Sequence, residues 1–262
     1  MTNKNDLQKE RRDFLKTSAL VAGGVMMSGY SWAGVNSSVD DTIKIALIGC
    51  GDRGTGAAFQ ALSTKSNLKL VAMADAFQDR LDGSYKLLAE RFKEKVDVPK
   101  ERQFVGFDGY QKAIALADVV LLVTPPGFRP MHFEEAVKQG KHVFMEKPVA
   151  TDPAGVQRVL AAAEKAKAKK LNVVVGLQRH YQTSYRELMK RLQDGMVGDV
   201  VSASAWWNND GVWVNPRKAG QTEMEYQMRN WYYFNWLCGD HINEQHIHNI
   251  DVINWAKNSY PV

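Results

Sequence analysis

The chain has 262 residues, of which 45% are hydrophobic and 24% are charged, with a formal net charge of +5. This length suits one large domain or two modest ones, and the hydrophobic content excludes intrinsic disorder. Two cysteines cannot form a disulfide scaffold, so we expect both to be free. Acidic and basic residues are interspersed along the chain, and we therefore expect no nucleic-acid partner.

The N-terminus has the pattern of a secretory signal. A charged RRDFLK segment at residues 11–16 precedes an apolar stretch at 19–27 and a small-x-small cleavage pattern at 31–33. The paired arginines resemble those of twin-arginine signals. A short amphipathic helix is the alternative interpretation. We expect a signal peptide over residues 1–33, a polar leader over 34–41, export by the twin-arginine machinery to the periplasm or beyond, and no stable membrane anchor.

Residues 42–165 alternate between short apolar runs and helix-like segments. The apolar runs predict strands at 43–48, 68–74, 104–105, 119–123 and 142–145. The segments between them predict helices at 52–64, 78–94 and 130–139. Thr151-Asp152-Pro153 has the cap and the proline that begin a further helix. This alternation predicts an α/β fold with a doubly wound parallel sheet.

The remaining residues, 166–262, are interpreted as the start of a second domain. The expected elements are strands at 173–175 and 200–207, a polar loop at 208–222, and helices at 224–237 and 241–257. The strand at 200–207 would have no partner, and one strand alone is not a stable sheet. We therefore expect that the chain holds only part of this domain.

Gly49-Cys50-Gly51-Asp52-Arg53-Gly54 is a G-x-G-x-x-G sequence between a predicted strand and a predicted helix. Gly49 then permits a tight turn, Gly51 lets the backbone approach a pyrophosphate, and Gly54 allows the helix to pack closely on the strand. The start of the helix, at Asp52 and Arg53, offers unpaired N–H groups to phosphates. A glycine-rich turn without a ligand is the alternative; we expect a dinucleotide site.

Asp75 ends the second predicted strand, 26 positions after Gly49. A carboxylate at this place accepts hydrogen bonds from the adenosine ribose and repels a 2′-phosphate, which favours NAD over NADP. Arg80 is the competing signal, because an arginine can pair with a 2′-phosphate. We expect NAD as the cofactor, with NADP as the alternative.

Two proline-containing segments follow the next predicted strands, at the carboxyl edge where ligands bind in open α/β folds. Thr124-Pro125-Pro126 places a rigid loop there, either as a structural turn or as a contact to the cofactor. In Glu146-Lys147-Pro148 the proline restrains Lys147 to an extended backbone, and the Lys147–Pro148 bond is a candidate for the cis form. A lysine fixed at this edge can donate a hydrogen bond to a substrate hydroxyl or carbonyl.

The glycine loop, Asp75, T-P-P, E-K-P and Gly176-Leu177-Gln178-Arg179 occur in this order within residues 42–260. Together they resemble the glucose–fructose oxidoreductase and inositol dehydrogenase superfamily (Gfo/Idh/MocA). The resemblance implies an N-terminal Rossmann domain, a C-terminal α+β substrate and dimerisation domain with an open sheet, and a nicotinamide cofactor. It also implies that Lys147 belongs to the catalytic site and that Glu146 lies near the cofactor.

The second catalytic motif of that family is D-x-G-x-H-x-x-D, and residues 244–251 are its counterpart here. His248 and Asp251 match the motif, whereas Glu244 replaces its first Asp and His246 replaces its Gly. These departures leave the exact substrate and reaction open. A metal site formed by Glu244, His246 and His248 is an alternative, but on a regular helix His246 points about 200° away from His248. We expect no metal.

The residues themselves point to the same helix. At about 100° per residue, His241, Glu244, His248, Asp251 and Trp255 fall within an arc of about 80°. A histidine beside a carboxylate can serve as a general base near neutral pH. We therefore expect Lys147, His248 and Glu244 to be the catalytic residues.

Three further residues are expected to bind the substrate, namely Arg179, Asp251 and Trp213. Trp213 lies in the polar loop and is the aromatic best placed to stack on a sugar ring. Most of the other aromatic residues of this region are expected to pack in the core.

These features predict an exported NAD(P)-dependent oxidoreductase that acts on a sugar, polyol or glycoside by hydride transfer and holds its cofactor tightly. Besides the export machinery, the expected partners are a carbohydrate substrate and further copies of the chain in a homo-oligomer. A redox-assisted glycosidase or lyase, which acts through a transient keto-sugar, is the first alternative. A non-catalytic dinucleotide- or sugar-binding protein is the second, although the presence of Lys147 and His248 argues against it.

Overall fold

A computed structural model describes residues 41–208 and 210–260 of the chain. One parallel sheet in this structure positions the candidate functional residues. Its strand order is β3-β2-β1-β4-β5-β6, and every neighbouring pair is parallel. The strands are β1 (Ile43–Ile48), β2 (Leu68–Asp75), β3 (Gln103–Val105), β4 (Val119–Leu122), β5 (His142–Met145) and β6 (Val173–Val175). The predicted signal peptide and leader lie outside the described residues, apart from residue 41.

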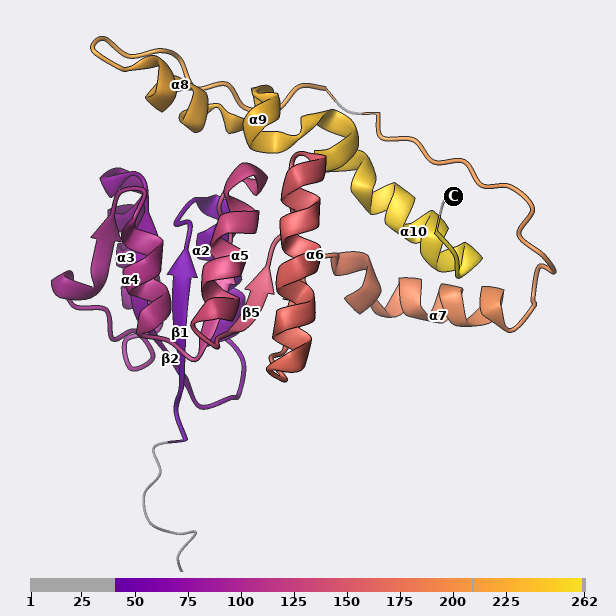
Figure 1. Cartoon of the computed structure of the whole chain (residues 1–262), viewed down its shortest axis with the longest axis horizontal. Coiled ribbons are helices and arrows are strands. Elements are labelled where there is room, and N and C mark those ends of the chain that lie inside the picture. The colour runs from indigo at the N-terminus through magenta and orange to yellow at the C-terminus, as the bar shows by residue number, and fades with distance from the viewer. Residues whose placement is uncertain (1–40, 209, 261–262) are drawn as a thin grey trace, which may run out of the picture. The chain divides into compact units, whose positions relative to one another are not determined.

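Five longer helices and two short ones connect these strands (Figure 1). They are α2 (Asp52–Leu62), α3 (Gln78–Arg91), η2 (Lys100–Arg102), α4 (Gly109–Ala115), η3 (Pro126–Phe128), α5 (Arg129–Lys138) and α6 (Pro153–Ala168). The predicted doubly wound parallel sheet is confirmed, and its strands begin and end within a few residues of the predicted bounds. The sheet also runs past residue 165, where the first domain was expected to end, because β6 pairs with β5. Helix α4 was not predicted.

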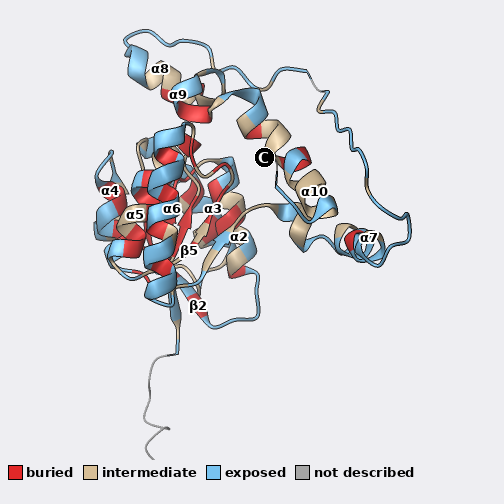
Figure 2. Ribbon diagram, turned by 45° about the vertical axis from the view of Figure 1, so that its right-hand side comes forward, coloured by how far each residue is buried: buried red, intermediate tan, exposed pale blue. Residues whose placement is uncertain are grey.

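The sheet is buried on both faces, which explains the continuous apolar run Ile45–Ile48 in β1. Successive residues of a strand point to opposite faces. Ala46 and Ile48 belong to one core cluster, with residues of α4, α5 and α6, whereas Ile45 and Leu47 belong to a second cluster, with residues of α2 and α3. In Figure 2 the buried residues accordingly gather in the sheet and on the helix faces that cover it.

Local signals in the sequence account for the helix ends. The Asp152 carboxylate accepts a hydrogen bond from the N–H of Gly155 at 2.7 Å, and Pro153 occupies the first turn of α6, as predicted. Gly140 follows α5 with a φ of +72°, a conformation that glycine adopts without strain. Cys50 and Cys238 are both free and buried, also as predicted.

Beyond β6 the regular elements of the described residues are all helices. The helices are η4 (Gln178–Tyr181), α7 (Thr183–Gln193), α8 (Glu223–Arg229), η5 (Trp231–Tyr233), α9 (Asn235–Cys238), the π-helical turn η6 (Ile242–His246) and α10 (Ile247–Lys257). The expected helix at 224–237 is thus divided into three pieces, and α7 was not predicted. None of the described helices is long and apolar enough to cross a membrane.

The prediction of a strand at 200–207 is wrong, and with it the α+β character expected for the second domain is absent from the described residues. This segment has no regular structure and is almost entirely exposed. It is held to α10 by side chains, because Asn249 donates to the carbonyl of Trp206 at 2.9 Å and Lys257 to that of Val200 at 2.7 Å. Without a second strand to pair with, the backbone cannot form a ladder.

Candidate functional site

A cavity of about 900 Å³ lies at the carboxyl ends of the strands and is lined on its other side by residues after position 210. It brings together most of the residues predicted from the sequence. These are Gly49, Gly51, Asp52, Arg53, Gly54, Asp75, Thr124, Pro125, Pro126, Glu146, Lys147, Trp213, Glu244 and His248. The predicted substrate-binding residues Arg179 and Asp251 are not among its lining residues.

The glycine loop has the shape that a dinucleotide pyrophosphate requires. Gly49 has a φ of +96°, and a Cβ built there would lie 2.7 Å from the backbone of Val123. A Cβ on Gly54 would lie 1.8 Å from the carbonyl oxygen of Gly49, so this glycine allows α2 to pack against the loop. A Cβ on Gly51 would meet nothing within 4 Å, which leaves open space beside the loop. Gly51 also begins α2 without a side-chain cap, so the first N–H groups of the helix can receive an anion.

Asp75 fastens the end of β2 to this loop. Its carboxylate accepts hydrogen bonds from the N–H of Cys50 at 2.6 Å and from the N–H of Phe77 at 2.8 Å. Burial raises the pKa of Asp75, and these two hydrogen bonds oppose the rise. Each carboxylate oxygen has two lone pairs, so Asp75 can still accept from a ligand. The competing Arg80 lies 3.4 Å from the carboxylate of Asp52, with both side chains exposed.

Glu146 is buried at the end of β5 and is paired with the glycine loop. The Nε atom of Arg53 donates to its Oε1 atom at 2.6 Å. A Cβ on Gly176, which follows β6, would lie 2.8 Å from the other oxygen of Glu146, so a larger residue there would displace the carboxylate. The pair thus joins the start of α2 to the end of β5.

Lys147 and Glu244 form the closest charge pair of the cavity. The Nζ atom of Lys147 donates to Oε1 of Glu244 at 2.5 Å and to the backbone carbonyl of the same residue at 2.7 Å. Burial raises the pKa of Glu244, while the neighbouring Lys147 ammonium opposes the rise. The peptide bond between Lys147 and Pro148 is cis, in agreement with the prediction.

Arg129 is a buried cation of this site that the sequence did not reveal. Its side chain donates to the carbonyl of Leu122 at 2.7 Å and to that of Pro148 at 3.4 Å. Burial lowers the pKa of Arg129 to about 10, although the carboxylates of Glu146 and Glu244 oppose this. An arginine at the start of a helix has no sequence signal that distinguishes it from a solvated one.

His248 is buried in the cavity as a neutral imidazole. Burial, together with the positive charges of Lys147 and Arg179, lowers its pKa to about 4. The ring of Trp207 stacks on it, with centroids 5.9 Å apart. The predicted helix face is changed by the π-helical turn η6, whose wider turn rotates the residues before Ile247. His241 consequently lies outside the cavity, against the ring of His246, while Glu244 still lines it.

Arg179 and Asp251 hold α10 in place. Arg179 donates to the carbonyl of His248 at 2.9 Å and to the side chain of Asn249 at 2.7 Å. The carboxylate of Asp251 lies 2.9 Å from Nε2 of His180, whose ring stacks on Trp255. The structure therefore places both residues beside the cavity wall, where they position His248.

Aromatic side chains form the wall opposite the sheet. The ring centroid of Trp213 lies 6.1 Å from that of Trp231 and 6.3 Å from that of Tyr232. The hydroxyl of Tyr232 and the Oε2 atom of Glu244 are buried, and neither has a hydrogen-bond partner among the described residues. Burial raises the pKa of Tyr232, so its hydroxyl is neutral and can donate. Two polar atoms without partners in one cavity indicate a site for a polar ligand.

The metal alternative has no support in the described part of the chain, where no group of three or more His, Cys, Asp or Glu side chains is placed to hold an ion. His246 faces His241 and does not line the cavity with His248. Glu244 is already engaged by Lys147.

Comparisons with known proteins point to one family. Residues 43–176, just over half of the chain, match the family GFO_IDH_MocA, described as an oxidoreductase family with an NAD-binding Rossmann fold. An inositol 2-dehydrogenase/D-chiro-inositol 3-dehydrogenase of Halalkalibacterium halodurans is 26% identical over 215 residues, which cover 82% of this chain and 52% of that protein. A glycosyl hydrolase family 109 protein of Streptomyces coelicolor is 24% identical over 183 residues, covering 69% and 37%.

Among solved structures, scyllo-inositol dehydrogenase from Lactobacillus casei, with bound cofactor NAD(H) and scyllo-inositol, has a TM-score of 0.59 and 26% identity. The alignment covers 83% of this chain and 56% of that one. The chain spans about half the length of the first curated relatives that it matches.

Proposed function

The chain belongs to the GFO_IDH_MocA family of oxidoreductases, and from this membership and the geometry of the cavity we propose that it binds NAD and oxidises or reduces a hydroxyl-bearing carbon of a sugar, polyol or glycoside. One observation carries the proposal. The glycine loop and Asp75 line the same cavity as Lys147 and His248, so a nucleotide site and a polar reaction site are continuous. Ligands bind at this edge of open α/β sheets.

The glycine loop and Asp75 fit a dinucleotide. The open space beside Gly51 and the uncapped start of α2 suit the pyrophosphate, and the Asp75 carboxylate suits the ribose hydroxyls. Asp75 would repel a 2′-phosphate, which supports NAD. NADP stays the alternative because Arg80 also lines the cavity. Thr124, Pro125 and Pro126 complete this wall and are proposed to contact the cofactor.

When bound, the nicotinamide supplies the acceptor or donor for hydride. The protein's own residues would then handle the proton. The neutral imidazole of His248 can accept the proton of a substrate hydroxyl, since its depressed pKa keeps it unprotonated near neutral pH. An ammonium has three N–H donors, and Glu244 takes two of those of Lys147, so one is left for the substrate oxygen. A positive charge fixed there stabilises a developing alkoxide.

We propose that Tyr232, Glu244 and Trp213 recognise the substrate. The free hydroxyl of Tyr232 and the free Oε2 atom of Glu244 offer one donor and one acceptor, which suits adjacent hydroxyl groups of a ring. Trp213 offers an aromatic face. The relatives named as inositol and scyllo-inositol dehydrogenases support a cyclic polyol or sugar as the substrate class.

The purified protein provides the test. Its bound nucleotide is identified by mass after denaturation, and NADH formation is then followed with a panel of cyclic polyols and sugars. We expect NAD to be found, and at least one of these substrates to reduce it. A protein that holds no nucleotide and shows no binding of added NAD or NADP would overturn the proposal.

A redox-neutral cleavage of glycosides is the second candidate, and the relative named as a glycosyl hydrolase family 109 protein favours it. In that reaction a hydroxyl-bearing carbon would be oxidised transiently by the bound NAD, which acidifies a neighbouring C–H. Elimination would break the glycosidic bond, water would add to the double bond that is left, and return of the hydride would reduce the ketone. Product analysis separates the two reactions. Only the second releases the free sugar from an aryl glycoside without net formation of NADH.

We further propose that residues 1–33 direct export through the twin-arginine machinery, on the evidence of the sequence pattern alone. Replacing Arg11 and Arg12 together by lysine should then retain the precursor in the cytoplasm. Normal export of this variant, measured by fractionation, would assign export to another route.

The predicted homo-oligomer is also a proposal, and sedimentation of the purified protein tests it.

A further inference from the structure

Helix α8 is fastened to helix α3 by a single arginine at the nucleotide end of the cavity. We propose that Arg229 is a clasp residue, which holds residues 212–232, here named the cap segment, against α3 and thereby slows the release of the bound dinucleotide. The inference rests on the proposed function, because it concerns the same NAD. It assigns a role to a residue that neither contacts the reacting atoms nor belongs to the glycine loop.

The guanidinium of Arg229 is bound on three sides. Its two terminal nitrogens donate to the two carboxylate oxygens of Asp79, each at 3.0 Å, in a fork-to-fork arrangement. Its Nε atom donates to Glu225 at 3.0 Å, and its charged carbon lies 4.1 Å from the centroid of the Phe77 ring. The hydrogen bond from Arg229 lowers the pKa of Asp79. Only 17% of the arginine side chain is exposed, so its position is well defined.

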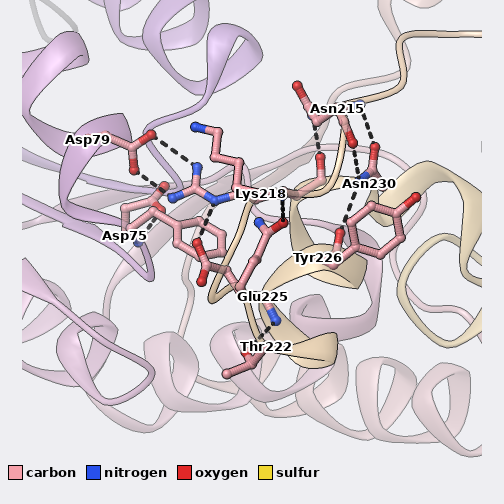
Figure 3. A network of polar contacts seen from close by, with 11 residues as sticks. Asp75, Asp79, Asn215, Lys218, Thr222, Glu225, Tyr226 and Asn230 are labelled. Atoms are coloured by element: carbon pink, nitrogen blue, oxygen red, sulfur yellow. Dashed lines mark hydrogen bonds and ion pairs between the residues drawn. The ribbon is translucent and has the colours of Figure 1, made fainter.

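The cap segment is a stiff unit, so movement of Arg229 moves the whole wall. The buried side chain of Asn230 accepts from the N–H of Asn215 at 2.7 Å and donates to the carbonyl of Asn215 at 3.1 Å (Figure 3). The Thr222 hydroxyl caps α8 by accepting from the N–H of Glu225. Tyr233 donates to the carbonyl of Val212 at 2.7 Å. Loop and helix are thus cross-linked on each side of Arg229.

This unit lies over the proposed ribose site. Arg229 lines the cavity together with Asp75 and Phe77, and Phe77 is the residue on which the guanidinium rests. Figure 3 shows Asp75 and Asp79 together on one side of the contact, with Glu225 and Asn230 across from them. A nucleotide held by Asp75 would therefore have the clasp beside its adenosine end.

The cap segment is attached at two places, by close packing at its C-terminal side and by a polar pair at the α3 side. At its C-terminal side the chain continues into α9, which packs so closely on η3 that a Cβ on Gly127 would lie 2.5 Å from the carbonyl oxygen of Trp236. At the α3 side the contact is a polar pair, and 62% of the Asp79 side chain is exposed. Water and salt reach such a pair, so it can open without disturbing the core. The nucleotide end is therefore where the cavity opens.

The test measures the release of NADH from the purified protein. Protein loaded with NADH is mixed with excess NAD, and the loss of bound NADH fluorescence gives the rate of release. R229Q keeps the three-carbon stem of the side chain and removes its charge and fork, while D79N removes the charge of the partner. The matched control is R158Q, because Arg158 pairs with Glu134 on the surface and lines no part of the cavity.

We expect R229Q and D79N each to release NADH about fivefold faster or more, which is the scale for losing a partly exposed bidentate pair. The double variant should be no faster than R229Q, since both changes remove one contact. R158Q should match the wild type. Raising the salt from about 0.05 M to about 0.5 M should bring the wild-type rate toward that of R229Q.

Three results would contradict the proposed role of Arg229 or the NAD binding on which it rests. Wild-type release rates in both R229Q and D79N, with NADH bound normally, overturn the clasp and leave the proposed function intact. Equal acceleration by R158Q also overturns it, because the effect would then be one of surface charge. A wild-type protein that binds neither NADH nor NAD overturns the proposed function, and the clasp with it. Melting curves of each variant confirm that the rates come from folded protein.

Discussion

The glycine loop allows a prediction in which stability and cofactor binding change independently. Gly51→Ala and Gly54→Ala each add one methyl group to the same loop, three residues apart. The added Cβ would meet nothing within 4 Å at position 51, but would lie 1.8 Å from the carbonyl oxygen of Gly49 at position 54. The first variant should therefore fold normally and lose NAD, whereas the second should lose stability.

The magnitudes follow from these surroundings. Gly51 has a φ of −70° and a ψ of −176°, which alanine adopts freely, so the substitution should raise the free energy of unfolding by about 0.4–1 kcal/mol through a less flexible unfolded chain. At position 54 the Cβ overlaps a backbone atom, and overpacking of this kind costs about 1–3 kcal/mol or more. A methyl group at position 51 would occupy the space left for the pyrophosphate, and NAD binding should weaken by about tenfold or more.

Urea unfolding of nucleotide-free protein gives the stabilities, and titration with NADH gives the affinities. Gly83→Ala is the matched control, because a Cβ in the middle of α3 also meets nothing within 4 Å and alanine favours a helix by about 0.5–1 kcal/mol. It should raise stability without changing the affinity for NADH. A Gly51→Ala protein that binds NADH as tightly as the wild type would show that the loop does not hold the pyrophosphate.

Three further predictions concern the walls of the cavity. His248→Ala and Lys147→Ala should each lower turnover by about a hundredfold or more with NADH affinity little changed, and the double variant should be little worse than either, as steady-state kinetics would show. Asp75→Ala should weaken NAD binding more than NADP binding and also lower the melting temperature, because two backbone N–H groups lose their acceptor. The free energy of unfolding should fall as the pH is lowered from about 6.5 toward 4. In the folded chain the pKa of His248 is depressed to about 4 and that of His132 to about 3. The same histidines in the unfolded chain therefore take up protons at a higher pH, which favours unfolding. Urea unfolding across this range tests the last point, and His132→Gln should flatten the curve.

The sheet and the nucleotide end of the site could be predicted because their signals are local. A strand segment buried on both faces must be continuously apolar, and Ile45–Ile48 is such a run. The glycine loop that follows it is constrained by contacts within a few residues and by the neighbouring strand. Asp75 and Lys147 follow strands of the same sheet, and parallel strands bring their carboxyl ends to one edge.

The other wall could not be predicted, since it depends on contacts distant in sequence. Asp79 and Arg229 are 150 residues apart, and Lys147 and Glu244 are 97 residues apart. No periodic pattern in the sequence predicts which of these distant residues form a pair. The π-helical turn η6 also changes the helix face that a regular period of 3.6 residues predicts, which is why His241 does not share the cavity with Glu244 and His248.

The balance of buried charge links these parts to the kind of substrate proposed. Two carboxylates, Glu146 and Glu244, and the cation Arg129 are buried around the reaction site, and the partly buried Lys147 is paired directly with Glu244. Burying a charge is costly unless an opposite charge compensates it, so this set stays ionised only as a whole. An uncharged hydroxylated ring leaves the balance intact. A carboxylate or a phosphate at the same place would add negative charge beside Glu146 and Glu244, whose cationic partners, Arg53 and Lys147, are already bound to them. The charge pattern therefore supports a neutral polyol or sugar over a sugar phosphate.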